Sequence, residues 1–226
     1  MLNKYLNERT NLNSTKEAWE FAWFKQRSRV SDIINIGRRI YNYFLFRFLK
    51  KYINNQTEFL EFGCGTATLG VRLAREVKSY TGFDIAENAL KEAVENFKKS
   101  GIKNFSFEIK DITKLQSDKQ FDIVWSQGLI EHFAELHKLI NSHLMACRRG
   151  GRVIISVPAR YSYHYLWYTL TRLNFLRKFW PWPDQIFISK KMFNQYMKIL
   201  EGNYSRYSIF YLKPRILGLL IIIIEK

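Results

Sequence analysis

Two glycines and a nearby carboxylate are the residues of this sequence whose types and spacing could do chemistry. The segment Glu58–Ala67 reads EFLEFGCGTA, in which a short apolar run carries Glu61 and leads into Gly63, Cys64 and Gly65. Glycine admits positive φ values and lets the backbone approach a ligand without a Cβ in the way. A strand that turns sharply into a helix here would point unpaired backbone N–H groups at a ligand, which is typical of a nucleotide-type cofactor site.

The flanking acids discriminate between cofactors. A dinucleotide-binding turn normally reads G-x-G-x-x-G, whereas the residues from Gly63 read G-C-G-T-A-T, so the third glycine is missing. Glu61 would repel a pyrophosphate but suits a ligand with a cationic amino-acid end. Asp84 closes the next predicted strand, about 20 residues further on, where such folds place the acid that accepts ribose hydroxyls.

These residues together resemble the first motifs of the Rossmann-fold (class I) S-adenosylmethionine-dependent methyltransferases, in which an acid precedes G-x-G. The resemblance covers Glu58 to about Pro158, and it implies S-adenosylmethionine as cofactor and S-adenosylhomocysteine as product. It implies that Glu61 holds the methionine amino group and that Asp111 accepts from the adenine amino group, although a helix N-cap is the alternative role for Asp111. The full implied cofactor-binding set is Glu61, Gly63, Cys64, Gly65, Asp84, Ile85, Asp111, Ile112, Ser126 and Gln127.

The segment GLIEHF after the fourth predicted strand resembles the small-molecule and lipid branch of this family, including the quinone-biosynthesis type, where Leu-Glu-His follows the strand. Ile130 replaces the leucine here. His132 is the candidate general base because imidazole titrates near neutrality, and a structural role is its alternative. His164 is a second candidate. The Asn/Asp/Ser-Pro-Pro-aromatic motif of amino-directed nucleic-acid methyltransferases is absent at this place.

Alternating strand and helix patterns predict an α/β fold. We expect a seven-stranded, mostly parallel, doubly wound sheet with an antiparallel C-terminal hairpin. Residues 1–57 form an N-terminal helical segment on the substrate side, with residues 1–18 loosely docked and a helix over 33–53. Residues 58–226 form the Rossmann-like domain, with a helical insertion at about 159–188 after the fifth strand. The predicted strands are 58–62, 80–85, 105–112, 121–126, 152–158, 204–212 and 216–225, and the predicted helices are 66–77, 86–100, 134–148 and 189–200.

Basic and aromatic residues are concentrated outside the predicted cofactor core. Of the net charge of +16, residues 58–158 contribute 14 basic against 13 acidic residues, residues 1–57 contribute 11 against 4, and residues 159–226 contribute 11 against 3. The flanks therefore supply the predicted substrate side, where aromatic residues form either a lid or part of the core. The candidates are Trp19, Trp23, Tyr161, Tyr163, His164 and Trp167.

Three functions follow as hypotheses. The first is a methyltransferase for a small or lipid-like acceptor, the second an RNA methyltransferase with phosphate-binding basic flanks, and the third a non-catalytic cofactor-binding subunit. Cys64 and Cys147 lack metal-ligand spacing, so we expect reduced thiols, no metal and a cytoplasmic protein, either a monomer or a homodimer. No signal peptide or membrane span is expected, but basic and aromatic flanks favour peripheral contact with an anionic membrane over binding to nucleic acid.

Overall fold

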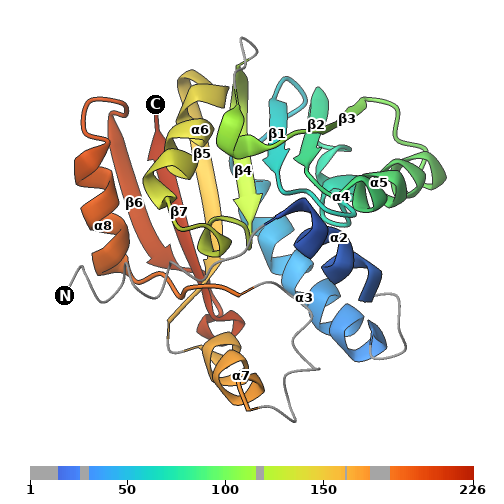
Figure 1. Ribbon diagram of the computed structural model, residues 1–226. Helices are drawn as coiled ribbons and strands as arrows, with labels where there is room; N and C mark the ends of the chain where they lie inside the picture. Colours follow the sequence, from blue (N-terminus) through green and yellow to red (C-terminus); the bar gives the residue numbers. More distant parts are fainter. Residues whose placement is uncertain (1–14, 26–30, 116–119, 161, 174–183) are drawn as a thin grey trace.

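A seven-stranded sheet runs through the centre of the protein, with helices on both of its faces (Figure 1). The computed structural model describes residues 15–25, 31–115, 120–160, 162–173 and 184–226. The strand order is β3-β2-β1-β4-β5-β7-β6; β1 to β5 pair in parallel, and β7 is antiparallel to both β5 and β6. This confirms the predicted fold. The strands are β1 (Glu58–Phe62), β2 (Ser79–Asp84), β3 (Phe105–Ile109), β4 (Phe121–Gln127), β5 (Cys147–Pro158), β6 (Arg206–Tyr211) and β7 (Leu219–Glu225).

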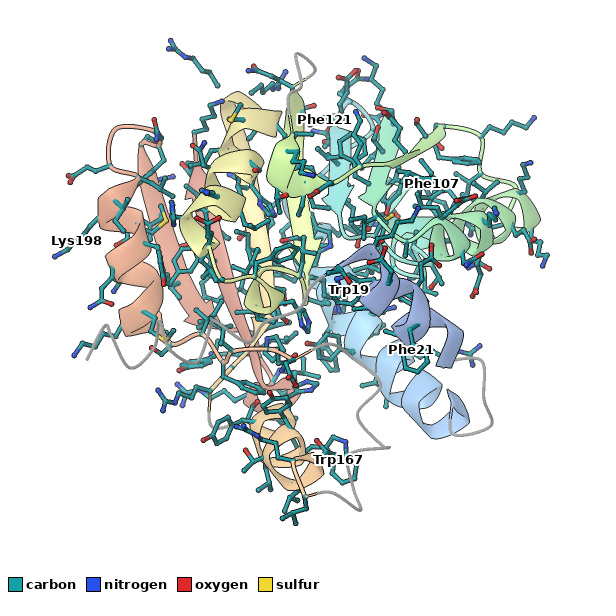
Figure 2. The ribbon with its side chains drawn as sticks, viewed as in Figure 1. Trp19, Phe21, Phe107, Phe121, Trp167 and Lys198 are labelled. Carbon is teal, nitrogen blue, oxygen red and sulfur yellow. The ribbon has the colours of Figure 1, made fainter. Side chains whose placement is uncertain are left out.

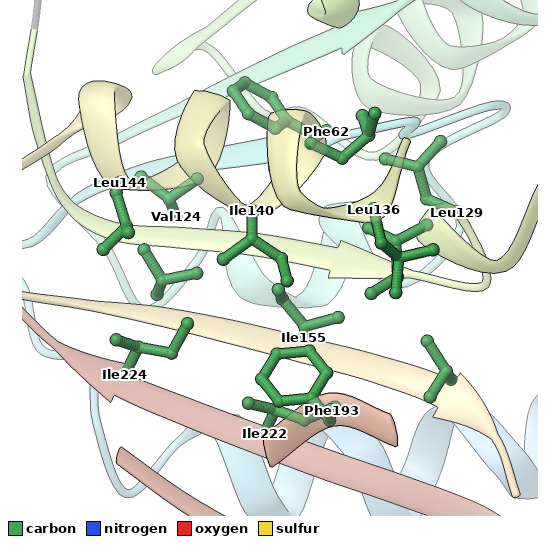
Figure 3. Packing of buried hydrophobic residues seen from close by; sticks show 14 of the residues in the cluster. Phe62, Val124, Leu129, Leu136, Ile140, Leu144, Ile155, Phe193, Ile222 and Ile224 are labelled. Atoms are coloured by element: carbon green, nitrogen blue, oxygen red, sulfur yellow. The ribbon is translucent and has the colours of Figure 1, made fainter. Parts of the chain in front are cut away.

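Side chains alternate along each strand, so each face of the sheet builds its own core. Leu60 and Phe62 of β1 pack on the face covered by α6 (Leu136–Ala146) and α8 (Lys190–Ile199), as Figure 3 shows for Phe62 and Phe193. Phe59 packs on the other face, with α3 (Ser31–Leu49) and α5 (Glu87–Lys99). Strand β7 is buried along nearly its whole length, which explains its continuous apolar sequence.

The carboxyl ends of the parallel strands meet at one edge of the sheet, where a ligand site is expected. Helix α2 (Lys16–Lys25) lies at this edge and packs against α5, and α7 (Tyr163–Thr171) lies beyond it (Figure 1). Two segments far apart in the sequence thus cover the same end of the sheet. None of the described helices is both long and apolar enough to cross a membrane.

Several predicted boundaries were wrong. The helix expected over 66–77 is only α4 (Gly70–Leu73), because residues 63–69 form an extended turn. The helix expected over 134–148 ends at Ala146, and the strand expected over 152–158 already begins at Cys147. The third strand ends at Ile109, so Asp111 and Ile112 belong to the 3-10 turn η1 (Ile112–Lys114) and its cap. Residues 16–18, expected to be loosely docked, lie in α2.

Candidate functional site

The glycine turn after β1 is fastened to the end of β2. The N–H groups of Gly63 and Cys64 both donate to the Phe83 carbonyl, at 2.8 and 3.2 Å. Gly63 and Gly65 have φ values of 64° and 52°, a region that favours glycine. A Cβ on Gly63 would also lie 2.8 Å from Leu129, and one on Gly65 only 2.2 Å from the Trp23 ring. Both positions therefore require glycine for conformation and for space.

Asp84 holds this turn from the neighbouring strand. Its Oδ2 accepts from the Gly65 N–H at 2.7 Å, and its Oδ1 accepts from the Ala86 N–H at 2.9 Å. The side chain is buried, and burial raises its pKa above the usual range against these two backbone hydrogen bonds. Each carboxylate oxygen has a further lone pair, so the same group can also accept from a ribose hydroxyl.

Glu61 is a buried carboxylate on the sheet face that carries Phe59. It lies in register between Gly82 of β2 and Trp125 of β4, and the Tyr80 hydroxyl donates to its Oε2. Burial raises the pKa of Glu61 to about 7, with the Tyr80 hydroxyl acting in the opposite direction. Because Glu61 lines the cavity described below, a cationic ligand group could supply the missing charge.

The thiol of Cys64 is buried and is poorly suited to act as a nucleophile. Its thiol is buried against β2, since a Cβ on Gly82 would lie 2.8 Å from Sγ. Burial raises the pKa of Cys64 well above that of a free thiol, and the charges of Asp84 and Glu61 act in the same direction. Cys64 and Cys147 are both free, as expected.

At the predicted adenine end, Asp111 caps η1. Its Oδ1 accepts from both the backbone N–H (3.0 Å) and the hydroxyl (2.6 Å) of Thr113, which is the alternative role considered for this residue. Asp111 nevertheless lines the cavity, together with the buried Ile112 and with Ile85. The cap leaves the second carboxylate oxygen directed to other partners, including Lys114 at 3.7 Å. An adenine contact for Asp111 stays a prediction.

Ser126 and Gln127, the two residues predicted at the end of β4, point to opposite faces of the sheet. Gln127 lines the cavity, whereas Ser126 does not. The Ser126 hydroxyl is fully buried on the opposite face of the sheet, 2.9 Å from Nε2 of His143 on α6. Successive strand residues point to opposite faces, so only one of the pair can reach a ligand. The side chain of Ser126 therefore does not reach the cavity, although the resemblance includes Ser126 in the cofactor-binding set.

His132 lies beyond β4 in the 3-10 turn η2 (Ile130–His132) and is buried at the cavity wall. Its Nδ1 is 3.0 Å from the Asp184 carbonyl oxygen. A carbonyl only accepts, so Nδ1 carries the proton of the neutral imidazole and Nε2 is the basic nitrogen. The Trp19 ring meets the imidazole edge-on, with 4.9 Å between centroids.

Helix α2 covers the cavity at the carboxyl ends of the parallel strands. Its Glu20 accepts from the Glu87 N–H and from the Asn88 side chain, both at 2.7 Å, which fastens α2 to the start of α5. Trp23 then covers Gly65, while Trp19 reaches His132. Figure 2 shows Trp19 where α2 meets the end of β4, and Trp167 apart from it on α7. Both tryptophans of α2 line the cavity and belong to neither core cluster, and their role as a lid stays a prediction.

One cavity of about 670 Å³ joins these parts. From the predicted cofactor set it is lined by Glu61, Gly63, Cys64, Asp84, Ile85, Asp111, Ile112 and Gln127. From the predicted substrate side it is lined by Trp19, Trp23, His132, His164 and Trp167. Gly65 lies under Trp23 instead, Tyr161 falls outside the described residues, and so does the side chain of Tyr163.

Four polar residues of the site were missed in the sequence. Tyr80 binds Glu61, Asn42 of α3 lines the cavity, and Glu131 and Gln185 are buried in its wall. Glu131 stands next to His132 in the GLIEHF segment, so the motif itself was the available signal. Gln185 had none, because only the fold brings it beside residues 131 and 132.

Comparisons with known proteins agree with this geometry. Residues 53–199, about two thirds of the chain, match the methyltransferase domain family. A ubiquinone biosynthesis O-methyltransferase of Rickettsia conorii is 27% identical over 112 residues, which are 50% of this chain and 38% of that protein. The chain thus spans less than half the length of the curated relatives it matches.

Solved structures show the same fold. DhpI in complex with S-adenosylhomocysteine superposes with a TM-score of 0.68 at 16% identity, over 96% of this chain and 97% of that one. The magnesium protoporphyrin IX methyltransferase of Synechocystis, also with bound S-adenosylhomocysteine, gives a TM-score of 0.64 at 18% identity, over 96% and 98%. With the family match and the cavity of acids and glycines, these likenesses lead to one assignment. The chain belongs to the methyltransferase domain family, of the class I, S-adenosylmethionine-dependent type.

Proposed function

We propose that this protein transfers a methyl group from S-adenosylmethionine to a small-molecule acceptor of apolar, aromatic or lipid-like character. The observation that carries the proposal is the single cavity that joins two chemically different ends. One end holds Glu61, the glycine turn and Asp84; the other holds Trp19, His132 and Trp167. A donor and an acceptor could therefore meet inside one enclosed space.

The residues present fit the donor. Glu61 is a buried carboxylate at the cavity wall, where burial disfavours its charge until a cation is bound. The ammonium group of a methionine moiety provides such a cation. Asp84, whose two oxygens already fix the turn, is the group for the ribose hydroxyls. When bound, S-adenosylmethionine supplies a methyl group activated by a positively charged sulfur.

The protein's main contribution is then positioning. A preformed turn and a lid that hold the donor and acceptor in line replace a bimolecular encounter with a unimolecular step. Trp19 and Trp23 exclude water above the site, because α2 is tied to α5 through Glu20. His132, with its basic Nε2, is the candidate to take a proton from the acceptor.

A transfer experiment with methyl-labelled donor tests this function. The protein is incubated with labelled S-adenosylmethionine and a lipid and metabolite extract, or with total RNA, and label is counted in each product. Calorimetry with S-adenosylhomocysteine, and with NAD as control, tests donor binding separately. Label in organic-soluble products supports the proposal. Label only in RNA would favour the RNA hypothesis, and binding without transfer would favour the non-catalytic one.

We further propose that the protein meets its acceptor at an anionic membrane surface. Leu166 and Leu170 lie one turn apart on α7 and Leu173 follows its end; the three are 40–61% exposed, and Ile216 is 80% exposed. We call these four residues the apolar face. Exposed cations lie close to them in the sequence, namely Arg172, Lys213 and Arg215.

The two segments of the apolar face are neighbours in space. The Ala159 N–H donates to the Gly218 carbonyl at 2.8 Å, and Gly218 packs against Ser162, the N-cap of α7. Exposed apolar groups beside cations suit a lipid–water interface with anionic headgroups. Since Trp167 of the same helix lines the cavity, an acceptor dissolved in the membrane would enter beside the apolar face.

A further inference from the structure

Two polar groups in the cavity wall lack hydrogen-bond partners among the residues that the structure describes. Neither carboxyl oxygen of Glu131 has one, and the side chain is only 1% exposed. The Nε2 atom of Gln185 also lacks a hydrogen-bond partner among the described residues, and 7% of that residue is exposed. Both residues line the cavity. A buried polar group without a partner is costly, so a ligand that satisfies these groups would bind with a clear advantage.

The backbone brings the two residues into neighbouring segments of the cavity wall. The Ile186 N–H donates to the Glu131 carbonyl at 3.0 Å, and His132 Nδ1 lies 3.0 Å from the Asp184 carbonyl. Gln185 thus stands between the two residues that bind η2. Glu131, Gln185 and Ile186 are buried, so packed residues hold the pair, although Asp184 itself is exposed.

Among the residues that the structure describes, no cation compensates the charge of Glu131. Burial raises its pKa to about 8, and no neighbouring cation contributes to this shift. Lys110, a cation of the cavity wall, is engaged with Glu108 at 2.9 Å and lies over the Phe83 ring, on the side of β2 and β3. A ligand carboxylate would be buried beside Glu131 with no described cation to compensate its charge, which is unfavourable.

The complementary ligand group both donates and accepts a hydrogen bond and carries no charge. We propose that Glu131 and Gln185 form a subsite for a hydroxyl group of the methyl acceptor, with the hydroxyl donating to the Glu131 carboxyl and accepting from Gln185 Nε2. This inference rests on the proposed function and specifies its acceptor as an alcohol or phenol. The site thereby selects for a hydroxyl against an acceptor that carries a methyl group or a carboxylate at that position.

Three one-ring probes, namely phenol, toluene and benzoate, test the subsite. Their dissociation constants are measured by saturation-transfer NMR on the protein loaded with S-adenosylhomocysteine. We expect phenol to bind more tightly than toluene and benzoate. In Glu131→Leu and in Gln185→Leu, the ratio of the toluene to the phenol constant should fall about tenfold, the effect of one lost hydrogen bond to a buried group. Glu135→Leu, at an exposed carboxylate four residues away, is the matched control and should leave the ratio unchanged.

Folding and cofactor binding are checked independently. Replacing an unpaired buried carboxyl by leucine should not lower the melting temperature, and Glu131→Gln, which keeps an accepting oxygen, should retain most of the preference for phenol. An unaltered ratio in Glu131→Leu, or benzoate bound as tightly as phenol, overturns the subsite. Failure of S-adenosylhomocysteine to bind would instead defeat the proposed function, and the ratio measured on the cofactor-free protein still decides the subsite.

Discussion

The Gly65 N–H donates to the Asp84 carboxylate at 2.7 Å, so the acid assigned to the ribose also holds the glycine turn in place. The two functions belong to one side chain because β2 ends directly beside the turn that follows β1. In this site the cofactor-binding acid is a structural residue before any ligand arrives.

Replacing Asp84 should therefore affect stability and binding together. Asp84→Ala removes the acceptor for two buried N–H groups, those of Gly65 and Ala86. We expect a loss of about 1–3 kcal/mol in the free energy of unfolding, and a similar loss in affinity for S-adenosylhomocysteine. Urea unfolding and calorimetry measure the two quantities. Glu95→Ala, at an exposed ion pair with Lys99 on α5, is the control, and a folded Asp84→Ala protein with unchanged affinity would contradict the assignment.

Stability should fall as the pH rises from 6.5 to 8. The pKa values of Glu61 and Glu131 are raised to about 7 and about 8, from 4.5. In this window the folded protein holds more protons than the unfolded chain, so raising the pH favours unfolding. The buried His143 and His164 have pKa values lowered to about 4, and they act in the opposite sense, mostly below pH 6.5, where the unfolded histidines are protonated.

The expected decrease between pH 6.5 and 8 is about 2 kcal/mol in the free energy of unfolding, from the two carboxyl groups together. Urea titrations at both pH values give the difference. The double variant Glu61→Gln with Glu131→Gln should be nearly flat over the same window. A wild-type curve that rises with pH would show that the two carboxyl groups are ionised in the folded protein.

Most strands of the sheet were predictable because each is an apolar run, and glycines mark several of the turns between strands and helices. The helix after the glycine turn was not, since residues 66–69 are apolar or small enough to suit a helix but pack as an extended turn. The contact between Gly65 and the Trp23 ring could not be predicted from the sequence either. A sequence shows that Gly65 needs open space, but it does not show that Trp23, more than forty residues earlier, fills that space.

Binding of the methyl donor should release a proton at mildly acidic pH. Glu61, with a pKa of about 7, is largely protonated at pH 6 and must ionise to accept from the ligand's ammonium group. Calorimetry in two buffers of different ionisation enthalpy should show the release of close to one proton at pH 6 and clearly less at pH 7.5. Glu61→Gln should abolish the difference, whereas Glu58→Gln, at an exposed pair with Lys78, should preserve it.

The side-chain direction at the end of β4 explains two further errors. Ser126 lies at the carboxyl end of its strand, as predicted, but strand alternation turns its side chain toward His143. Glu131 was passed over because His132 beside it has the more familiar chemistry. Whether a carboxyl is buried and unpaired depends on the segment 184–186, which approaches only in the folded chain.

His132→Ala should lower turnover about 10²–10⁴-fold if His132 takes the acceptor's proton. The affinity for S-adenosylhomocysteine should remain unchanged, because the residue lies on the side of Trp19 and not at the glycine turn. Steady-state rates with an identified acceptor, together with calorimetry, separate the two effects. His137→Ala, at a half-buried histidine of α6 that does not line the cavity, is the control. A loss of only a few-fold would assign His132 to packing against Trp19 and leave positioning as the main source of rate.

The apolar face should determine membrane binding. Leu166→Ser with Leu170→Ser removes two exposed apolar side chains of α7 without touching the cavity residue Trp167. We expect the wild-type protein to co-sediment with anionic liposomes more strongly than with neutral ones, and the double variant to lose at least half of this binding. Added salt should weaken the wild-type interaction, since each basic residue near an anionic surface contributes up to about 1 kcal/mol.

A matched surface change separates this apolar contact from general basicity. Ile199→Ser, at an isolated exposed residue of α8, changes hydropathy elsewhere on the protein and should leave liposome binding intact. A structured RNA added as competitor tests the remaining alternative. If RNA displaces the protein from liposomes and the double variant still binds RNA at full strength, the basic residues and not the apolar face determine the partner. In that event the acceptor would be sought among nucleic acids. An apolar face that does not bind lipid would give an acceptor in the membrane no path into the cavity beside Trp167.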